Sequence, residues 1–171
     1  HNAPASGPTN TAGSTLSMAS QGKKDVGAAL RNVAMTGAVL VVKSGESIQA
    51  AVVKAKPGDT IKVMPGVYKE TVYIDKDNIA IVGVIVDGEW PLMDGERKLN
   101  DAILYSGSGI RIENMKITHY KGNGIMGQAG NNFVIRYNWI VDTGVYGIFP
   151  EFGKNGLIEY NVVSGIEDAA I

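Results

Sequence analysis

Residues able to carry acid–base or binding chemistry recur around three isoleucines that are 23 residues apart, Ile125, Ile148 and Ile171. They are, in chain order, His119, Tyr120, Lys121, Asp142, Tyr146, Glu151, Phe152 and Asp168. If Ile125 and Ile148 point inward on equivalent strands, Met126 and Phe149 point outward, because side chains alternate along a strand. Stacked repeats would then bring the flanking polar residues close together on one surface. The alternative without a functional role is that these charged residues are ordinary solvated turn residues.

Aromatic residues indicate what this surface could bind, since aromatic faces stack on sugar rings. The sequence predicts a sugar-binding set composed of Trp90, Tyr120, Tyr146 and Phe152. The second tryptophan, Trp139, is expected to pack in the core instead.

The elements that position these residues are short repeated strands. Asn114, Asn138 and Asn161 are each followed by an apolar residue and preceded, four residues earlier, by another. A period between 20 and 50 residues is typical of solenoids, and β-type runs broken by Gly, Asn or Ser suit one coil of a parallel β-helix. We therefore predict an all-β, single-stranded parallel β-helix in which the three asparagines stack as a hydrogen-bonded ladder.

Two charged residues fit this repeat imperfectly. Arg136 and Glu159 stand two residues before their asparagines, where the preceding repeat has the apolar Ile112. Either the side-chain alternation shifts in one of the coils, or Arg136 and Glu159 form a stacked ion pair.

Composition excludes several functional classes. The 171 residues include 16 basic and 17 acidic side chains without a basic patch, so no nucleic-acid partner is expected. The absence of cysteine excludes disulfides, cysteine metal sites and a cysteine-linked lipid anchor. The longest charge-free stretch within the expected fold, residues 32–42, is too short for a transmembrane segment.

Residues 1–35 are predicted to be a low-complexity tether with a short helix near its end, and residues 36–171 a β-helix. Residues 1–22 are rich in Ala, Ser, Gly, Thr and Pro and carry no Lys, Arg, Asp or Glu, a composition that cannot bury enough apolar area to fold alone. Apolar residues at helical spacing place the short helix within 24–35.

A second, amphipathic helix is predicted at 46–55, after Ser44 or Gly45 as its cap and before Pro57-Gly58. Its apolar face would cover the first coil, which otherwise exposes strand edges and core. At the other end, Ile171 stands where the repeat requires a further strand, so we expect further coils or another chain to cover it.

An insertion is expected at 88–101, between an early coil that ends at Gly83 and the coil that begins at Gly109. It contains Trp90 and Arg97. Long loops on a solenoid gather on one face, often the binding face.

The sequence between residues 42 and 83 resembles the N-terminal part of the right-handed parallel β-helix of the pectin-lyase-like superfamily. The resemblance lies in Ser-Ile-Gln-Ala-Ala-Val (47–52), Pro-Gly-Asp-Thr-Ile-Lys-Val-Met-Pro-Gly-Val-Tyr-Lys-Glu (57–70) and Asn-Ile-Ala-Ile-Val-Gly (78–83). The later Asn and Gly-Ile repeats resemble parallel β-helix repeat proteins of bacterial envelopes and secretions. The resemblance spans residues 39–171 and implies a right-handed coil with an N-terminal capping helix.

The resemblance also implies a chemistry. In a resembling lyase a base removes the proton beside a uronate carboxylate, and a cation, often Ca²⁺, neutralises that carboxylate. It implies catalytic candidates His119, Lys121, Asp142 and Glu151, Ca²⁺ ligands Asp142, Glu151 and Asp168, and substrate contacts from Trp90, Arg97, Tyr120, Tyr146 and Phe152.

Specific catalytic signatures are weaker than the fold signal. The lyase pattern Trp-Ile-Asp-His is echoed only by Trp139-Ile140-Val141-Asp142, and the esterase, polygalacturonase and epimerase motifs are absent. Two hypotheses follow. The first is an extracellular, periplasmic or cell-envelope protein that binds or processes a polysaccharide, possibly acidic, as a lyase or hydrolase would. The alternative is a non-catalytic structural module that binds glycan or protein.

Overall fold

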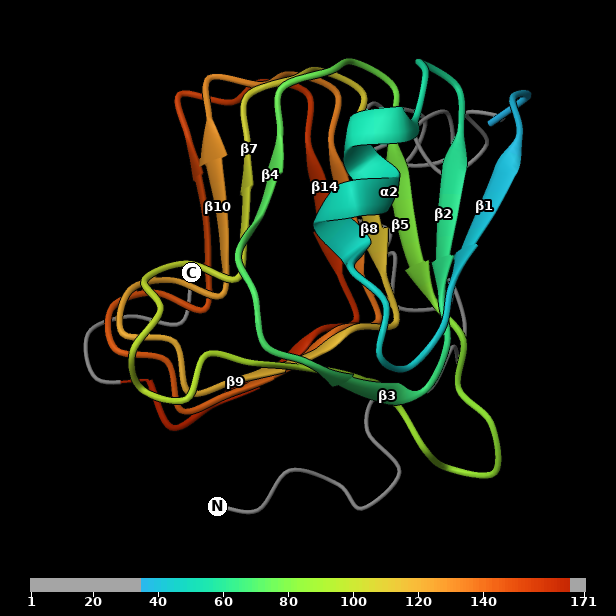
Figure 1. The fold of residues 1–171 in the computed structure, drawn as a ribbon. Helices are drawn as coiled ribbons and strands as arrows, with labels where there is room; N and C mark the ends of the chain where they lie inside the picture. The colour runs from blue at the N-terminus through green and yellow to red at the C-terminus, as the bar shows by residue number, and fades with distance from the viewer. Residues whose placement is uncertain (1–34, 167–171) are drawn as a thin grey trace.

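Three parallel sheets wrap around one core in the computed structural model, which describes residues 35–166 (Figure 1). Sheet A contains β1 (Val39–Val42), β2 (Thr60–Val63), β5 (Ala80–Gly83), β8 (Arg111–Glu113), β11 (Val134–Arg136) and β14 (Leu157–Glu159). Sheet B contains β3 (Gly66–Tyr68), β6 (Pro91–Asp94), β9 (Lys116–Thr118), β12 (Trp139–Val141) and β15 (Val162–Ser164). Sheet C contains β4 (Val72–Ile74), β7 (Ile103–Tyr105), β10 (Ile125–Gln128) and β13 (Ile148–Glu151). The chain runs from A to B to C in each coil, so the predicted parallel β-helix is confirmed.

Several predictions fall on residues outside this range. The tail 1–22, the helix predicted within 24–35, Asp168 and the environment of Ile171 lie outside the described residues. The boundary between tether and β-helix therefore stays a prediction.

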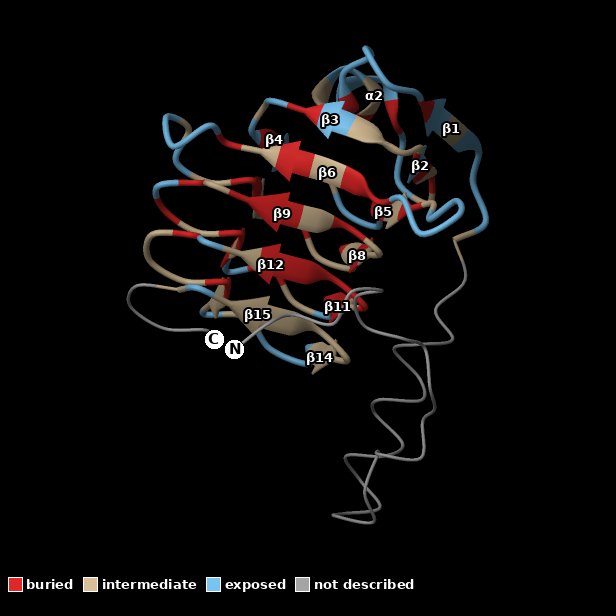
Figure 2. Cartoon of the chain, turned by 90° about the horizontal axis from the view of Figure 1, so that it is seen from below, coloured by how far each residue is buried: buried red, intermediate tan, exposed pale blue. Residues whose placement is uncertain are grey.

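The core consists of inward columns that repeat from coil to coil. Ile103, Ile125 and Ile148 pair in register on sheet C and are fully buried. Sheets A and B carry matching buried columns, namely Ile81, Ile112 and Ile135, and Met93, Ile117 and Ile140. Met126 and Phe149 pair on the outward face and are half-buried, as the alternation predicts. Figure 2 shows the same stacking from the side of sheet B.

The predicted capping helix is α2 (Ile48–Lys54), which lies across the N-terminal end of the coils (Figure 1). Its buried residues Ile48 and Val52 close that end of the core. The cap is Ser47 rather than Ser44 or Gly45, and its hydroxyl accepts from the Ala50 N–H. No helix within residues 35–166 is long and apolar enough to cross a membrane.

Charged side chains from the first coil hold both ends of α2. The carboxylate of Glu70 accepts hydrogen bonds from the backbone N–H groups of Ile48 and Gln49, at the positive end of the helix. The Lys76 ammonium donates to the Val52, Val53 and Ala55 carbonyls at the other end. The first coil therefore positions its own cover.

The asparagine ladder is shorter than predicted. Asn138 and Asn161 are in register, and the Asn138 side chain donates to the Asn161 Oδ1 atom and the Ile112 carbonyl. Asn114 is wrong as a third member, because the position that pairs with Asn138 is held by Met115, whose N–H donates to the Asn138 Oδ1 atom. Asn114 is the preceding residue of the same bend, with a left-handed φ of 58°.

The one-residue offset also settles the Arg136 and Glu159 positions. Ile112 pairs with Ile135, so Arg136 stacks between Glu113 and Glu159 on the outer face of sheet A. Arg136 lies 2.8 Å from the Glu113 carboxylate and 3.6 Å from that of Glu159. Of the two alternatives raised by the sequence, the ion pair holds, whereas the side-chain alternation of sheet A continues without a shift from coil to coil.

The insertion predicted at 88–101 is not one loop. Its middle contains strand β6, which pairs with β3 and β9 as an ordinary coil strand. The extra residues divide between two corners, 84–90 before β6 and 95–102 after it. Trp90 and Arg97 therefore lie at opposite ends of one strand of sheet B.

Candidate functional site

A column of left-handed residues follows the strands of sheet B, where the chain turns toward sheet C. We call this turn the B–C corner; it comprises residues 95–102, 119–124, 142–147 and, after β15, the described residues 165–166. His119, Asp142 and Gly165 occupy its first position in three coils, with φ values of 59°, 55° and 64°. A Cβ at Gly165 would meet the Asp142 carboxylate, so a larger residue there would require the Asp142 side chain to move. The left-handed backbone turns the chain sharply and leaves the His119 and Asp142 side chains partly exposed to solvent.

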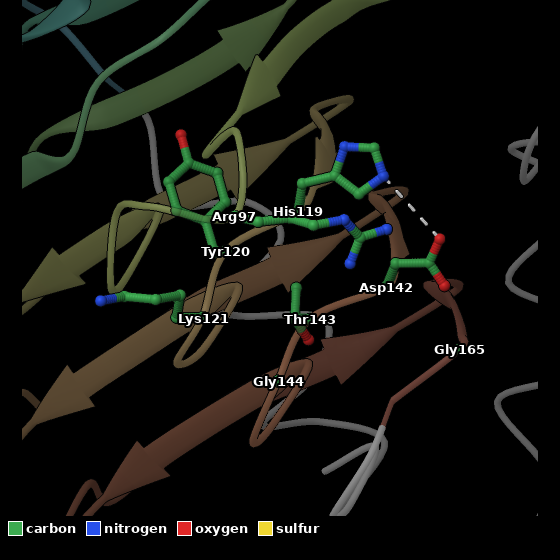
Figure 3. A pocket seen from close by; sticks show the side chains of 8 residues that line it. All are labelled: Arg97, His119, Tyr120, Lys121, Asp142, Thr143, Gly144 and Gly165. Atoms are coloured by element: carbon green, nitrogen blue, oxygen red, sulfur yellow. Dashed lines mark ion pairs between the residues drawn. The ribbon is translucent and has the colours of Figure 1, made fainter.

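His119 lies between two carboxylates from neighbouring coils. Its Nδ1 atom is 3.4 Å from the Asp94 Oδ1 atom, and its Nε2 atom is 4.0 Å from the Asp142 Oδ2 atom (Figure 3). A neutral imidazole donates through one nitrogen and accepts through the other. This arrangement can therefore orient His119 through Asp94 while Nε2 faces solvent and Asp142.

A pocket of about 330 Å³ opens around this histidine. Its lining consists of Arg97, His119, Tyr120, Lys121, Asp142, Thr143, Gly144 and Gly165 (Figure 3). The backbone N–H of Arg97 donates to the His119 carbonyl. This hydrogen bond joins the corner 95–102 to the following coil, which contains His119. In Figure 3 the Arg97 guanidinium lies on the side of His119 and Asp142, whereas Lys121 points the other way.

Two open cations allow this pocket to bind an anion. Arg97 and Lys121 contribute two positive charges, and the carboxylates of Asp142 and of Asp94 beside His119 balance them. Both cations are exposed, and neither has an ion-pair partner within residues 35–166. Guanidinium and ammonium groups with open donors bind carboxylates through charge-assisted hydrogen bonds.

Two aromatic residues predicted to contact sugar are buried. Tyr120 forms part of the pocket wall, but its hydroxyl points inward and donates to the Glu70 carbonyl at 2.6 Å. Burial raises the pKa of Tyr120 far above its usual range, so it stays neutral. Trp90 is buried against Trp139, at the far end of β6 from Arg97. The expectation that Trp90 and Tyr120 present open faces at this surface is wrong.

The remaining predicted residues separate along sheet C. Tyr146 stays near the B–C corner and packs on Phe149, with ring centroids 4.5 Å apart. Glu151 ends β13, and Phe152 follows it with 80% of its surface exposed. Glu151 and Phe152 thus stand at the opposite end of β13 from the pocket, and the single predicted surface divides into two.

This separation bears on the calcium prediction. Asp142 precedes the turn into β13 and Glu151 ends that strand, while Asp168 lies outside the described residues. Within residues 35–166, no three His, Cys, Asp or Glu side chains are grouped closely enough to hold a metal ion. The donors present do not fit a Ca²⁺ site, which takes six to eight oxygens, and we derive no step through calcium.

Asp94 and Thr143 belong to the site although sequence reasoning did not assign them to it. Asp94 orients His119, and the Thr143 hydroxyl donates to the Tyr146 carbonyl, which braces the corner. The sequence contained one sign of this role. Asp94 ends the strand Pro91–Asp94 and pairs with Thr118, the residue directly before His119 in the next coil.

Trp139 is a further correction. It is buried as predicted, but it points outward from sheet B in register with Lys116 and Val162, so it does not belong to the interior core. Lys116 and Trp90 cover it instead.

Comparison with known proteins identifies a family for most of the chain. A family model described as a right handed beta helix region matches residues 38–171. No curated protein and no solved structure matches the chain.

Proposed function

Because this chain belongs to the right-handed β-helix family, we propose that it binds or processes an acidic polysaccharide at the B–C corner. The site would lie outside the cell or in the cell envelope, where such polymers are found. The fold alone does not select this function, since one fold hosts many activities, so the proposal depends on the residues of the corner.

The observation that carries the proposal is the group of cationic and hydrogen-bonding side chains in one pocket. Arg97 and Lys121 offer open donors, and the His119 Nε2 atom lies 4.0 Å from the Asp142 Oδ2 atom in the same pocket. A uronate residue presents one carboxylate and several hydroxyls. Arg97 or Lys121 can bind its carboxylate, while Asp142 accepts a hydrogen bond from a hydroxyl.

The position of His119 supports a processing step as well as binding. In β-elimination, a base takes the proton from the carbon beside the carboxylate, the bond to the glycosidic oxygen breaks, and that oxygen leaves with a proton. The His119 side chain is partly exposed, and Asp94 lies beside its Nδ1 atom, which leaves Nε2 as the nitrogen for a general base. Arg97 would stabilise the charge that develops on the substrate carboxylate.

The test separates binding from turnover. Uronate oligomers are titrated into the chain by calorimetry, and the same mixtures are assayed for unsaturated products by ultraviolet absorbance and for new reducing ends. We expect binding that weakens in Arg97→Ala and Lys121→Ala. Turnover in wild type that is abolished by His119→Ala but not by His119→Lys, with binding retained in both, would support the base role.

Binding without turnover would favour the alternative, a non-catalytic glycan-binding module. Absence of binding to every uronate oligomer would contradict the proposal. Thermal melts of each variant serve as the control for folding.

A further inference from the structure

The outer face of sheet B carries a column of apolar side chains that crosses all five strands. Val67, Leu92, Lys116, Trp139 and Val162 occupy the same outward position in successive coils. Val67 is half-exposed, and Lys116 is the only charged member of the column. The column runs parallel to the solenoid axis, along the face seen in Figure 2.

Trp90 folds onto this column from the corner loop 84–90. Its ring meets that of Trp139 edge-to-face, with centroids 5.6 Å apart and an interplanar angle of 71°. The Lys116 ammonium lies 4.1 Å from the Trp139 ring centroid. The loop that ends at Trp90 is closed by a bridge between Val86 and Glu89, and at its start the Val84 N–H donates to the Val63 carbonyl of the preceding coil.

A groove of about 320 Å³ lies beside these rings. Its walls include Val67, Leu92, Glu89, Trp90, Lys116 and Trp139. The volume is within the range of pockets that bind small ligands. Apolar residues form the floor, and an exposed carboxylate and an ammonium group stand at its sides.

The two indole N–H groups next to this groove have no acceptor. Both nitrogen atoms are buried, and neither donates a hydrogen bond to any atom of residues 35–166. Buried donors of this kind are nearly always paired. An occupant that supplied acceptor oxygens would satisfy them after a modest rotation of Trp90.

We propose that this groove binds a neutral sugar residue, at a site separate from the B–C corner. A sugar ring has an apolar C–H face for Leu92 and the tryptophans, together with hydroxyls that both donate and accept. Those hydroxyls can donate to Glu89 and accept from Lys116 and the indoles. The opposite charges of Glu89 and Lys116 balance, so the groove does not select an anion.

This inference shares the glycan class with the proposed function but rests on different residues. Trp139 and Asp142 lie at opposite ends of β12, about 10 Å apart at roughly 3.3 Å per residue. Substitutions at one site therefore need not alter the other directly.

The chain reports on this groove by itself, because its two tryptophans are Trp90 and Trp139. The intrinsic fluorescence is followed while β-1,4-linked hexasaccharides of glucose, mannose, galactose and xylose are added. We expect a saturable change with at least one of them that persists at high ionic strength. Glu89→Gln and Trp90→Phe should each weaken it about tenfold, with Trp139 still reporting in the second variant.

Lysine variants provide the matched control. Lys116→Met should weaken the response, whereas Lys62→Met, an exposed lysine on sheet A, should leave it unchanged. If Trp90→Phe unfolds in a thermal melt, Glu89→Gln and Lys116→Met still test the groove. No saturable response to any of the four sugars, or an equal response in Lys116→Met and wild type, would overturn the inference.

The same samples distinguish this inference from the proposed function. Loss of uronate binding with a retained fluorescence response would contradict the corner site alone. Uronate binding with no response to neutral sugars would contradict the groove alone.

Discussion

At the corner between sheets A and B, the amide of Asn138 is buried with 0% exposure and is used entirely within the fold. It accepts from the Met115 N–H and donates to the Ile112 carbonyl and the Asn161 Oδ1 atom. Four residues later, at the B–C corner, the side chain of Asp142 is 47% exposed and faces His119 of the preceding coil. The first corner is two residues long in each regular coil, and the second is six.

The contrast between the two corners shows where function can be placed on a solenoid. In the two-residue corners of Asn138 and Asn161, the stacked amides satisfy backbone groups that would otherwise be buried without partners, so these polar residues are fixed by stability. A longer corner satisfies its backbone through neighbouring coils, as the N–H groups of His119, Lys121 and Gly144 show. Its side chains are then available for a ligand.

The largest effect is expected at Asn138. Asn138→Leu leaves the Met115 N–H and the Ile112 carbonyl buried without partners, which should cost about 3 kcal/mol or more of the free energy of unfolding. Urea denaturation measures it. Asp142→Asn at the other corner is the control and should change stability by about 0.5 kcal/mol or less. Equal losses at the two positions would remove the distinction between the corners.

Uronate binding should show the converse pattern. Arg97→Ala removes an exposed cation and should weaken binding about tenfold, or about 1.4 kcal/mol, while the free energy of unfolding stays near that of wild type. Raising the ionic strength should weaken wild-type binding more than that of the variant. Calorimetry at two salt concentrations checks both, and a salt-independent affinity in wild type would contradict an electrostatic site.

A smaller effect distinguishes the two asparagines of neighbouring coils. Asn114→Gly should change stability by about 1 kcal/mol at most, because Asn114 has a left-handed φ that glycine adopts freely. Asn138→Gly should cost severalfold more, since it removes the stacked amide. Urea denaturation of both variants tests the one-residue offset. A large loss of unfolding free energy in Asn114→Gly would instead indicate a three-membered ladder that includes Asn114.

The smallest effect extends the comparison to the start of the solenoid. Hydrogen bonds from the N–H groups of Lys56 and Ala38 lower the pKa of the Asp59 carboxyl below its ordinary value of 3.8. A depressed folded-state pKa stabilises the fold above the unfolded value and loses that contribution as the pH falls through the folded value. Melting temperature should therefore fall below about pH 4 more steeply in wild type than in Asp59→Asn, and parallel curves would exclude this role for Asp59.

The sequence predicted those features that the repeat period encodes. Ile125 and Ile148 point inward and α2 covers the first coil, because apolar spacing determines both. His119 and Asp142 come together because each follows a strand of the same sheet in adjacent coils.

The features that the sequence did not predict are those that depart from the 23-residue repeat. The spacing of 24 residues between Asn114 and Asn138, against 23 to Asn161, contained the register shift, but asparagine suits both positions of the bend. The path of the loop 84–90 has no counterpart in other coils, so the burial of Trp90 could not be predicted. Strand β6 was hidden because Pro91-Leu92-Met93-Asp94 has weak β-propensity.

The most direct test of the central claim is a titration of the isotope-labelled chain with a uronate trisaccharide, followed by the backbone amide shifts in NMR spectra. We expect the largest shifts at Arg97, His119, Lys121, Asp142 and Thr143, and nearly unchanged shifts at Asn138 and Asn161. Largest shifts at the A–B corner, or on the outer face of sheet B, would contradict the assignment of acidic polysaccharide binding to the B–C corner.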